Sequence, residues 1–282
     1  MFGGFFMLTL QMFYVNAKMM KSVFKGIALV GSFLGAMYLM QQVPWRETLK
    51  LDQAKNTTEE KVGELLWDFI KSTEREISDT LVVKIVDSIF VKVCESNKIN
   101  LNQYQVHIIE NNEVNAYAIP GNMIIIHSGL ISQCKNESEF TGVLSHELAH
   151  LELKHVTKKL VKEFGLAILI EMTSGGGGQI IREVLKFLSS TAYDRSLEEE
   201  ADLKAIDYMA NAGFDPKEFG NFMYRLSETD GSDSYIMGWV STHPDSRERA
   251  EYIIKNNPEK IERRIFITQS EWDLMVKRVQ SN

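Results

Sequence analysis

The sequence of 282 residues is poor in cysteine and lacks any concentration of basic residues. Its two cysteines, Cys94 and Cys134, are too few for a disulfide scaffold or a zinc site built from several thiolates, and they either pair or stay as free buried thiols. Basic residues never occur in runs longer than two, and the net charge is −7. This charge pattern offers no surface for tracking phosphates, so nucleic acid is not an expected partner.

The N-terminal segment differs in composition from the rest of the chain. An apolar run, residues 26–40, follows three basic residues: Lys18, Lys21 and Lys25. A run of this length after basic residues is typical of an export signal or a short membrane anchor, and translation from Met19 or Met20 would keep it. We therefore expect residues 1–45 to be a signal or membrane anchor. Residues 46–282 are expected to form one domain outside the cytosol, which would make the protein exported, periplasmic or membrane-anchored.

The pattern of apolar residues predicts a mainly helical α+β domain with a small sheet. Helices are expected in five regions: two between residues 58 and 97, one each at 137–163, 196–212 and 246–256, and one after Asp215-Pro216. Stretches rich in β-branched residues predict strands at 104–110, 114–119 and 122–127. A turn at Pro120-Gly121 joins the last two, so a mostly antiparallel sheet is expected. Four glycines at 175–178 separate two apolar segments too short to span a membrane, which favours a lid near a cleft.

The H-E-x-x-H string at 146–150 carries the strongest chemical signal. On a helix, His146 and His150 lie one turn apart on nearly the same face, so both imidazoles can reach one metal ion. Glu147 beside them can reach a water bound to that ion. Apolar residues surround most of this helix and predict that it is buried; two hydrogen-bonded core histidines are the alternative interpretation. His155 falls on the opposite side of the same helical wheel, so it is expected at the surface.

A catalytic zinc site with two histidines needs a third protein ligand, for which the chain offers no suitable histidine or cysteine pair. The acidic string at 196–202 contains Glu198 and Asp202, which share one face of a helix at i,i+4. One of these carboxylates can bind the metal while the other holds the N–H of a ligand imidazole. A solvated acidic face is the alternative, and Glu200 and Lys204 are expected to form an exposed ion pair on this helix.

Three motifs occur in an order and spacing that resemble one family: H-E-L-A-H at 146–150, the acidic string with the residues that follow it to 216, and Thr-His-Pro at 242–244. Over roughly residues 100 to 250 the chain resembles the gluzincin zinc metallopeptidases. These include HtpX, the CAAX prenyl endopeptidase, and exported or mitochondrial quality-control relatives. The resemblance implies a zincin-like fold with one Zn²⁺ per chain and these roles: Glu198 as the third ligand beside His146 and His150, Asp202 behind a ligand, and His243 facing the metal.

These residues predict metal-assisted hydrolysis of peptide bonds. A bound Zn²⁺ lowers the pKa of its water to about 7 and polarises a carbonyl, while Glu147 takes the water proton and passes it to the leaving amine. Extended or misfolded polypeptides are the expected substrates, as in protein quality control. The strand at 114–119 either pairs with them along a sheet edge or is an ordinary core strand. A non-catalytic zinc-stabilised binding protein or holdase, and a zinc hydrolase with other substrates, are the alternative functions.

His243 precedes Pro244, which favours an extended backbone at the histidine. Its imidazole could donate to the oxyanion of the tetrahedral intermediate, or act as a fourth ligand that keeps the enzyme inactive. A loop histidine that only caps the helix starting near Ser246 is the third interpretation. We expect the first role, so His243→Ala should lower activity and retain zinc.

Overall fold

The computed structural model describes residues 51–174, 178–228, 237–244, 246–256 and 265–281. The segment 1–45, expected to be a signal or membrane anchor, lies outside these residues, as do three of the four glycines at 175–178. In the described part of the chain, no helix combines the length and the apolar character that a membrane span requires. The described helices and strands belong to one compact unit, Asn56–Asn282, apart from the first residues of the first helix.

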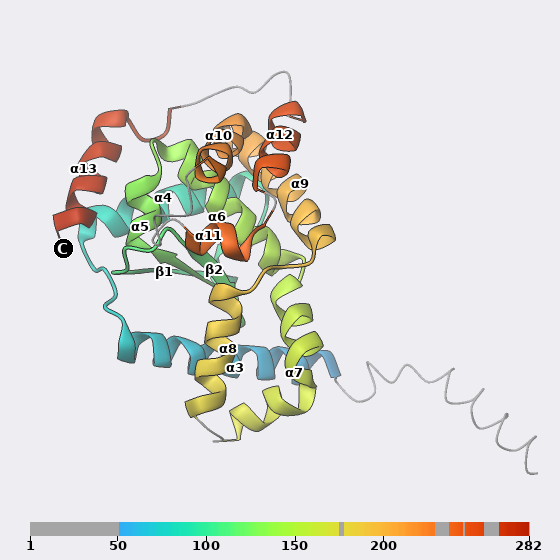
Figure 1. Ribbon diagram of the computed structural model, residues 1–282. Helices are drawn as coiled ribbons and strands as arrows, with labels where there is room; N and C mark the ends of the chain where they lie inside the picture. Colours follow the sequence, from blue (N-terminus) through green and yellow to red (C-terminus); the bar gives the residue numbers. More distant parts are fainter. Residues whose placement is uncertain (1–50, 175–177, 229–236, 245, 257–264, 282) are drawn as a thin grey trace, which may run out of the picture. The chain divides into compact units, whose positions relative to one another are not determined.

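Helices make up most of the described structure (Figure 1). The chain begins with α3 (Leu51–Thr73), α4 (Thr80–Ser96) and the short 3-10 helix η1 (Leu101–Gln103). Three strands follow: β1 (Gln105–Ile109), β2 (Ala116–Ile119) and β3 (Met123–His127). The remaining helices are α5 (Ser128–Gln133), α6 (Glu137–Glu152), α7 (His155–Thr173), α8 (Gly178–Ser190), α9 (Arg195–Ala212), α10 (Pro216–Ser227), α11 (Met237–Thr242), α12 (Ser246–Lys255) and α13 (Gln269–Ser281). The mainly helical α+β class predicted from the sequence is confirmed.

The three strands form a mixed sheet in the order β1-β3-β2. β2 pairs antiparallel with β3, as expected from the Pro120-Gly121 turn, and β1 pairs parallel with β3. At that turn Gly121 and Asn122 have φ angles of 78° and 58°, a left-handed conformation that these two residue types tolerate best. The tight return accounts for the antiparallel pairing of β2 with β3.

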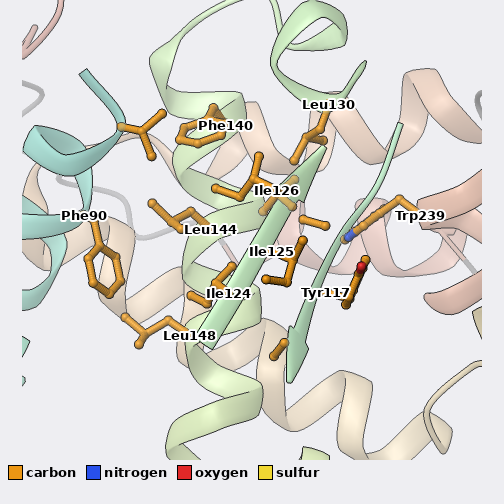
Figure 2. Close-up of a cluster of buried hydrophobic side chains, with 14 of the residues drawn as sticks. Phe90, Tyr117, Ile124, Ile125, Ile126, Leu130, Phe140, Leu144, Leu148 and Trp239 are labelled. Carbon is orange, nitrogen blue, oxygen red and sulfur yellow. The ribbon is translucent and has the colours of Figure 1, made fainter. Parts of the chain in front are cut away.

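β3 is buried along its whole length and carries the centre of the core. Figure 2 shows Ile124 and Ile126 of β3 toward the side of α6 that bears Leu144 and Leu148, while Tyr117 of β2 lies near Trp239. Alternate side chains of a strand point to opposite faces, so an uninterrupted apolar run such as β3 is suited to a sheet covered on both sides.

α6 is the helix around which the other elements are arranged, because it packs against β2, β3, α4, α7, α9 and α10. Its N-terminus is capped by Asn136, whose side chain accepts a hydrogen bond from the Glu139 N–H at 3.0 Å. At Gly142 an added methyl group would lie 2.4 Å from the Cβ of Phe219 in α10. The glycine therefore allows α10 to approach α6 closely.

The single helix expected at 137–163 is divided in two. α6 ends at Glu152, and α7 begins at His155. Between them Lys154 has a φ of 57°, in the left-handed region that ends a helix. The apolar pattern continues on both sides of this break, so periodicity alone did not reveal it.

The two apolar segments beside the glycine tract are α7 and α8. α8 packs against α7, β2 and α11. That this region acts as a lid stays a prediction. β2 is an edge strand of the sheet, yet all four of its residues are buried. The strand expected to guide a substrate is therefore covered in this arrangement.

Candidate metal centre

α6 and α9 pack against each other and bring together the three residues expected to bind metal. The Nε2 atoms of His146 and His150 are 2.9 Å apart. Those atoms lie 3.7 Å and 3.3 Å from the two carboxylate oxygens of Glu198. All three side chains are buried at an exposed fraction of 1% or less. A buried group of two imidazole nitrogens and a carboxylate matches the ligand chemistry of zinc.

Asp202 lies behind His146, one turn after Glu198 on α9. Its Oδ1 is 3.0 Å from Nδ1 of His146, although the ring is not aligned for a hydrogen bond. Arg249 of α12 donates to both oxygens of Asp202 at 2.7 Å and also contacts Glu198. Sequence reasoning missed Arg249, because nothing in the local sequence distinguishes it from the exposed Arg247 two residues earlier.

Glu147 contacts the sheet and His243. One of its oxygens accepts a hydrogen bond from the backbone N–H of Ala118 in β2 at 3.0 Å. The other lies 3.3 Å from Nε2 of His243. Burial, followed by the nearby Glu198 carboxylate, raises the pKa of Glu147 to about 8. A carboxyl group with a raised pKa beside a candidate metal site is suited to general-base chemistry near neutral pH.

His243 directly follows α11 and is 1% exposed, so it is not a surface residue. Its ring stacks on Trp239 with centroids 4.6 Å apart. The backbone N–H of Trp239 donates to the backbone carbonyl of Val114 at 2.9 Å and fixes α11 next to the start of β2. Trp239 carried no functional signal in the sequence, because its role depends on contacts distant along the chain.

The candidate ligands are electrically suited to a cation. Burial lowers the pKa of His146 and His243 well below the usual value, and that of His150 to about 3, so all three are neutral near pH 7. Neutral imidazoles present lone pairs to a metal. Burial also raises the pKa of Glu198 to about 8, against the opposing effect of Arg249. A bound cation would favour the ionised form of this carboxylate.

The expectation that His155 lies at the surface is wrong. His155 is fully buried, and its Nδ1 is hydrogen-bonded to Nδ1 of His150 at 3.0 Å. Its Nε2 is bonded to Oε2 of Glu200 at 3.2 Å. The error arose from extending one helical wheel through the turn at Lys154. Glu200 therefore reaches His155, while Lys204 lies over the ring of Tyr208 and not in the expected pair with Glu200.

A tyrosine and a lysine that the sequence did not identify complete the surroundings of His150. The ring of Tyr193 stacks on that of His150, with centroids 4.0 Å apart. The ammonium of Lys159 lies 4.0 Å from the centroid of Tyr193 and donates to the carbonyl of Thr191. Burial lowers the pKa of Lys159 to about 8. The cation thus holds the aromatic ring against His150.

The donor atoms fit a single metal ion. One atom from each of His146, His150, Glu198 and His243 lies within 4.8 Å of the others. Within the part of the chain that the structure describes, neither Nε2 of His243 nor Oε1 of Glu198 has a hydrogen-bond partner, although both are buried. Buried polar atoms without partners are costly, and a shared cation would satisfy them.

Comparison with known proteins places this site in a family. Residues 83–256 match Peptidase family M48. The chain belongs to this family. Its M48 region includes the H-E-x-x-H string, the acidic string and His243, so the resemblance to gluzincin metallopeptidases is confirmed. Membership supports a metal-dependent peptidase.

Several relatives in the family carry names that describe their activity. The chain is 27% identical over 160 residues to the mitochondrial metalloendopeptidase OMA1 of Schizosaccharomyces pombe, covering 56% of this chain and 48% of that protein. It is 25% identical over 229 residues to the beta-barrel assembly-enhancing protease of Yersinia pestis, covering 72% and 45%. The chain thus spans about half the length of the curated relatives it matches.

Proposed function

We propose that this chain is a zinc-dependent endopeptidase that hydrolyses extended or misfolded polypeptides in protein quality control. The observation that carries the proposal is the buried group of His146, His150 and Glu198, with Glu147 beside it. The names of the M48 relatives, a mitochondrial metalloendopeptidase and a beta-barrel assembly-enhancing protease, support the peptidase activity and the setting. The comparisons give no support to a non-catalytic holdase.

In the proposed mechanism His146, His150 and Glu198 would hold one Zn²⁺, and the chemistry that the ion would supply is an acidified water and polarisation of the scissile carbonyl. Glu147 accepts the proton of the attacking water and transfers it to the leaving amine. Asp202 and Arg249 hold the carboxylate side of the site in place. The neutral imidazoles of His146 and His150 fit the role of metal ligands, and the nearby carboxyl group of Glu147 fits the role of base.

The metal assignment is tested by elemental analysis of the purified chain. Wild-type protein should contain one zinc per chain, and His146→Ala and Glu198→Ala should contain little or none. Full zinc occupancy in either variant would remove that residue from the ligand set.

The catalytic assignment is tested with Glu147→Gln and an unfolded protein such as casein as substrate. The variant should keep its zinc and lose at least about a hundredfold in hydrolysis, the lower end of what a general base contributes. A chelator should abolish wild-type activity. Equal hydrolysis by the two proteins would exclude Glu147 as the base.

Substrate access requires movement of the covering elements, because every proposed ligand is buried. We propose that the edge of β2 then pairs with an extended substrate through main-chain hydrogen bonds. In the present arrangement the backbone N–H of Ala118 on this strand donates a hydrogen bond to Glu147, so it is not free to pair with a substrate.

Two roles fit the position of His243, and they predict opposite changes. As an oxyanion donor, its loss in His243→Ala should lower hydrolysis by about 10² to 10³ with zinc retained. As a fourth ligand in the closed arrangement, its loss should raise hydrolysis. Its place among the four clustered donors supports the second role in this arrangement.

We also propose that the peptidase domain lies outside the cytosol, anchored or exported through residues 1–45. The basic residues before the apolar run support this orientation. The names of these relatives, mitochondrial or associated with barrel assembly, are compatible with a location at or beyond a membrane. A reporter fused after Asn282 that works only in the cytosol would contradict it.

A further inference from the structure

The two histidines of the H-E-x-x-H string differ in what lies behind them. His146 faces the carboxylate of Asp202 directly. His150 faces a second imidazole, that of His155, which in turn reaches the carboxylate of Glu200. The three side chains form a continuous row from the candidate metal site to the surface: His155 is fully buried, whereas the Glu200 side chain is 54% exposed.

The hydrogen bonds in this row fix where each proton lies. If Nε2 of His150 binds a metal, the remaining proton of its neutral ring is on Nδ1. That N–H donates to Nδ1 of His155, so the proton of the neutral His155 ring must be on Nε2. This second N–H donates to Oε2 of Glu200. One arrangement of protons therefore satisfies both hydrogen bonds and leaves the metal-facing nitrogen of His150 unprotonated.

The backbone places His155 in this position by means of the break between α6 and α7. The left-handed conformation of Lys154 turns the chain, so that the first residue of α7 lies beside the last turn of α6. The rings of His150 and His155 have centroids 5.1 Å apart. A continuous helix would have placed residue 155 on the opposite side from His146.

We propose that His155 and Glu200 are positioning residues, which orient His150 and hold it in the tautomer that binds metal through Nε2. The inference rests on the proposed ligand role of His150. Carboxylates behind a metal-binding histidine commonly fix its orientation and raise its basicity. Here an intervening imidazole transmits the effect of a carboxylate that remains in contact with solvent.

Glu200→Gln in the full-length chain is the central test, because the residue is half exposed and its substitution leaves the core intact. Zinc affinity, measured by competition with a chromophoric chelator, should fall about tenfold, the lower end of the range for such partners. The visible absorption spectrum of the cobalt-substituted protein should shift, because it reports ligand geometry. Glu199→Gln removes the neighbouring carboxylate, which is exposed on the same helix, and should change neither reading.

Variants at His155 separate positioning from packing. His155→Phe keeps a ring but removes both nitrogens, and it should weaken zinc binding at least as much as Glu200→Gln. His155→Asn places an acceptor oxygen near the site of Nδ1 and should restore much of the affinity. The double variant His155→Phe/Glu200→Gln should bind zinc like His155→Phe alone, because the two residues act through one row.

Unchanged zinc affinity and an unchanged cobalt spectrum in Glu200→Gln would overturn the inference, as would additive losses in the double variant. If His155→Phe does not fold, Glu200→Gln with its Glu199→Gln control decides alone. Failure of the proposed metal site is recognised separately: His150→Ala would then retain zinc at wild-type affinity. A loss of zinc in His150→Ala together with no effect of Glu200→Gln would leave the ligand set standing and remove the positioning row.

Discussion

At the candidate metal centre, His146 and His150 each have a carboxylate-containing group of side chains behind them, and the two groups differ in burial. Behind His146, Asp202 is 1% exposed and is held by two hydrogen bonds from the buried Arg249. Behind His150, the neutral His155 leads to a carboxylate that is half in solvent. The first side depends on a charge network closed to water, and the second on a row of hydrogen bonds that reaches the surface.

This difference determines what each side contributes. Charges interact strongly in a buried site, and removing one partner leaves the other without compensation. An exposed carboxylate is screened and contributes less. The Asp202 side should therefore influence both stability and metal affinity, whereas the Glu200 side should influence metal affinity alone.

The largest effect is expected from Arg249→Met, which removes the buried cation that holds Asp202. The variant leaves the buried carboxylate of Asp202 unpaired, so the free energy of unfolding should fall by about 3–5 kcal/mol. Urea unfolding of the metal-free protein measures it. Arg247→Met on the same helix is the control, because Arg247 is exposed. It makes ion pairs with Glu228 and Glu251 and contacts Tyr224 at the surface, and its loss should change stability by less than about 0.5 kcal/mol. Similar stabilities of the two variants would show that the buried network is not a structural element.

A smaller effect, a loss of zinc affinity, is expected from Asp202→Asn. The amide keeps the shape of the side chain but loses the charge that holds His146 and Arg249, so zinc affinity should fall about 10- to 100-fold. The loss should exceed that of Glu200→Gln under the same conditions. Equal losses would mean that the directness of the contact and its burial do not matter.

The sequence predicted the residues of α6 and α9 that form the candidate metal site because local rules govern them. The i,i+4 spacing of His146 and His150, and of Glu198 and Asp202, already places each pair on one helix face. The cap at Asn136 was likewise a local signal. The structure brings these two faces together, as expected.

The outer parts of the site could not be predicted because they depend on tertiary placement. The turn at Lys154 interrupts an apolar pattern that suits a continuous helix, so His155 was assigned to the wrong side. Arg249 and Lys159 look like ordinary surface cations in the sequence, and only the fold shows that they are buried. The mixed sheet has the same origin, because strand order is not encoded in the strands' own composition.

The zinc-affinity losses on the two sides should also differ in their dependence on salt. In 1 M salt the Debye length is about 3 Å, so the field of an exposed carboxylate is largely screened while that of a buried one is not. The affinity loss caused by Glu200→Gln should therefore shrink between low and high salt, whereas that of Asp202→Asn should persist. Chelator competition at two salt concentrations measures both. A loss for Glu200→Gln that is independent of salt would indicate that its carboxylate acts as a buried group.

The smallest effect is expected from Lys204→Ala, which tests which partner Glu200 uses. The i,i+4 spacing alone pairs Glu200 with Lys204, but in the structure Glu200 reaches His155 and the Lys204 ammonium lies 5.4 Å from the centroid of the Tyr208 ring. Loss of this cation should cost less than about 1 kcal/mol in unfolding free energy and leave zinc affinity unchanged. If Lys204 instead holds Glu200, its removal would release the carboxylate and weaken zinc binding as much as Glu200→Gln does. Measuring zinc affinity in these two variants side by side therefore decides whether the exposed end of the row is anchored by the buried imidazole or by its neighbour on the helix surface.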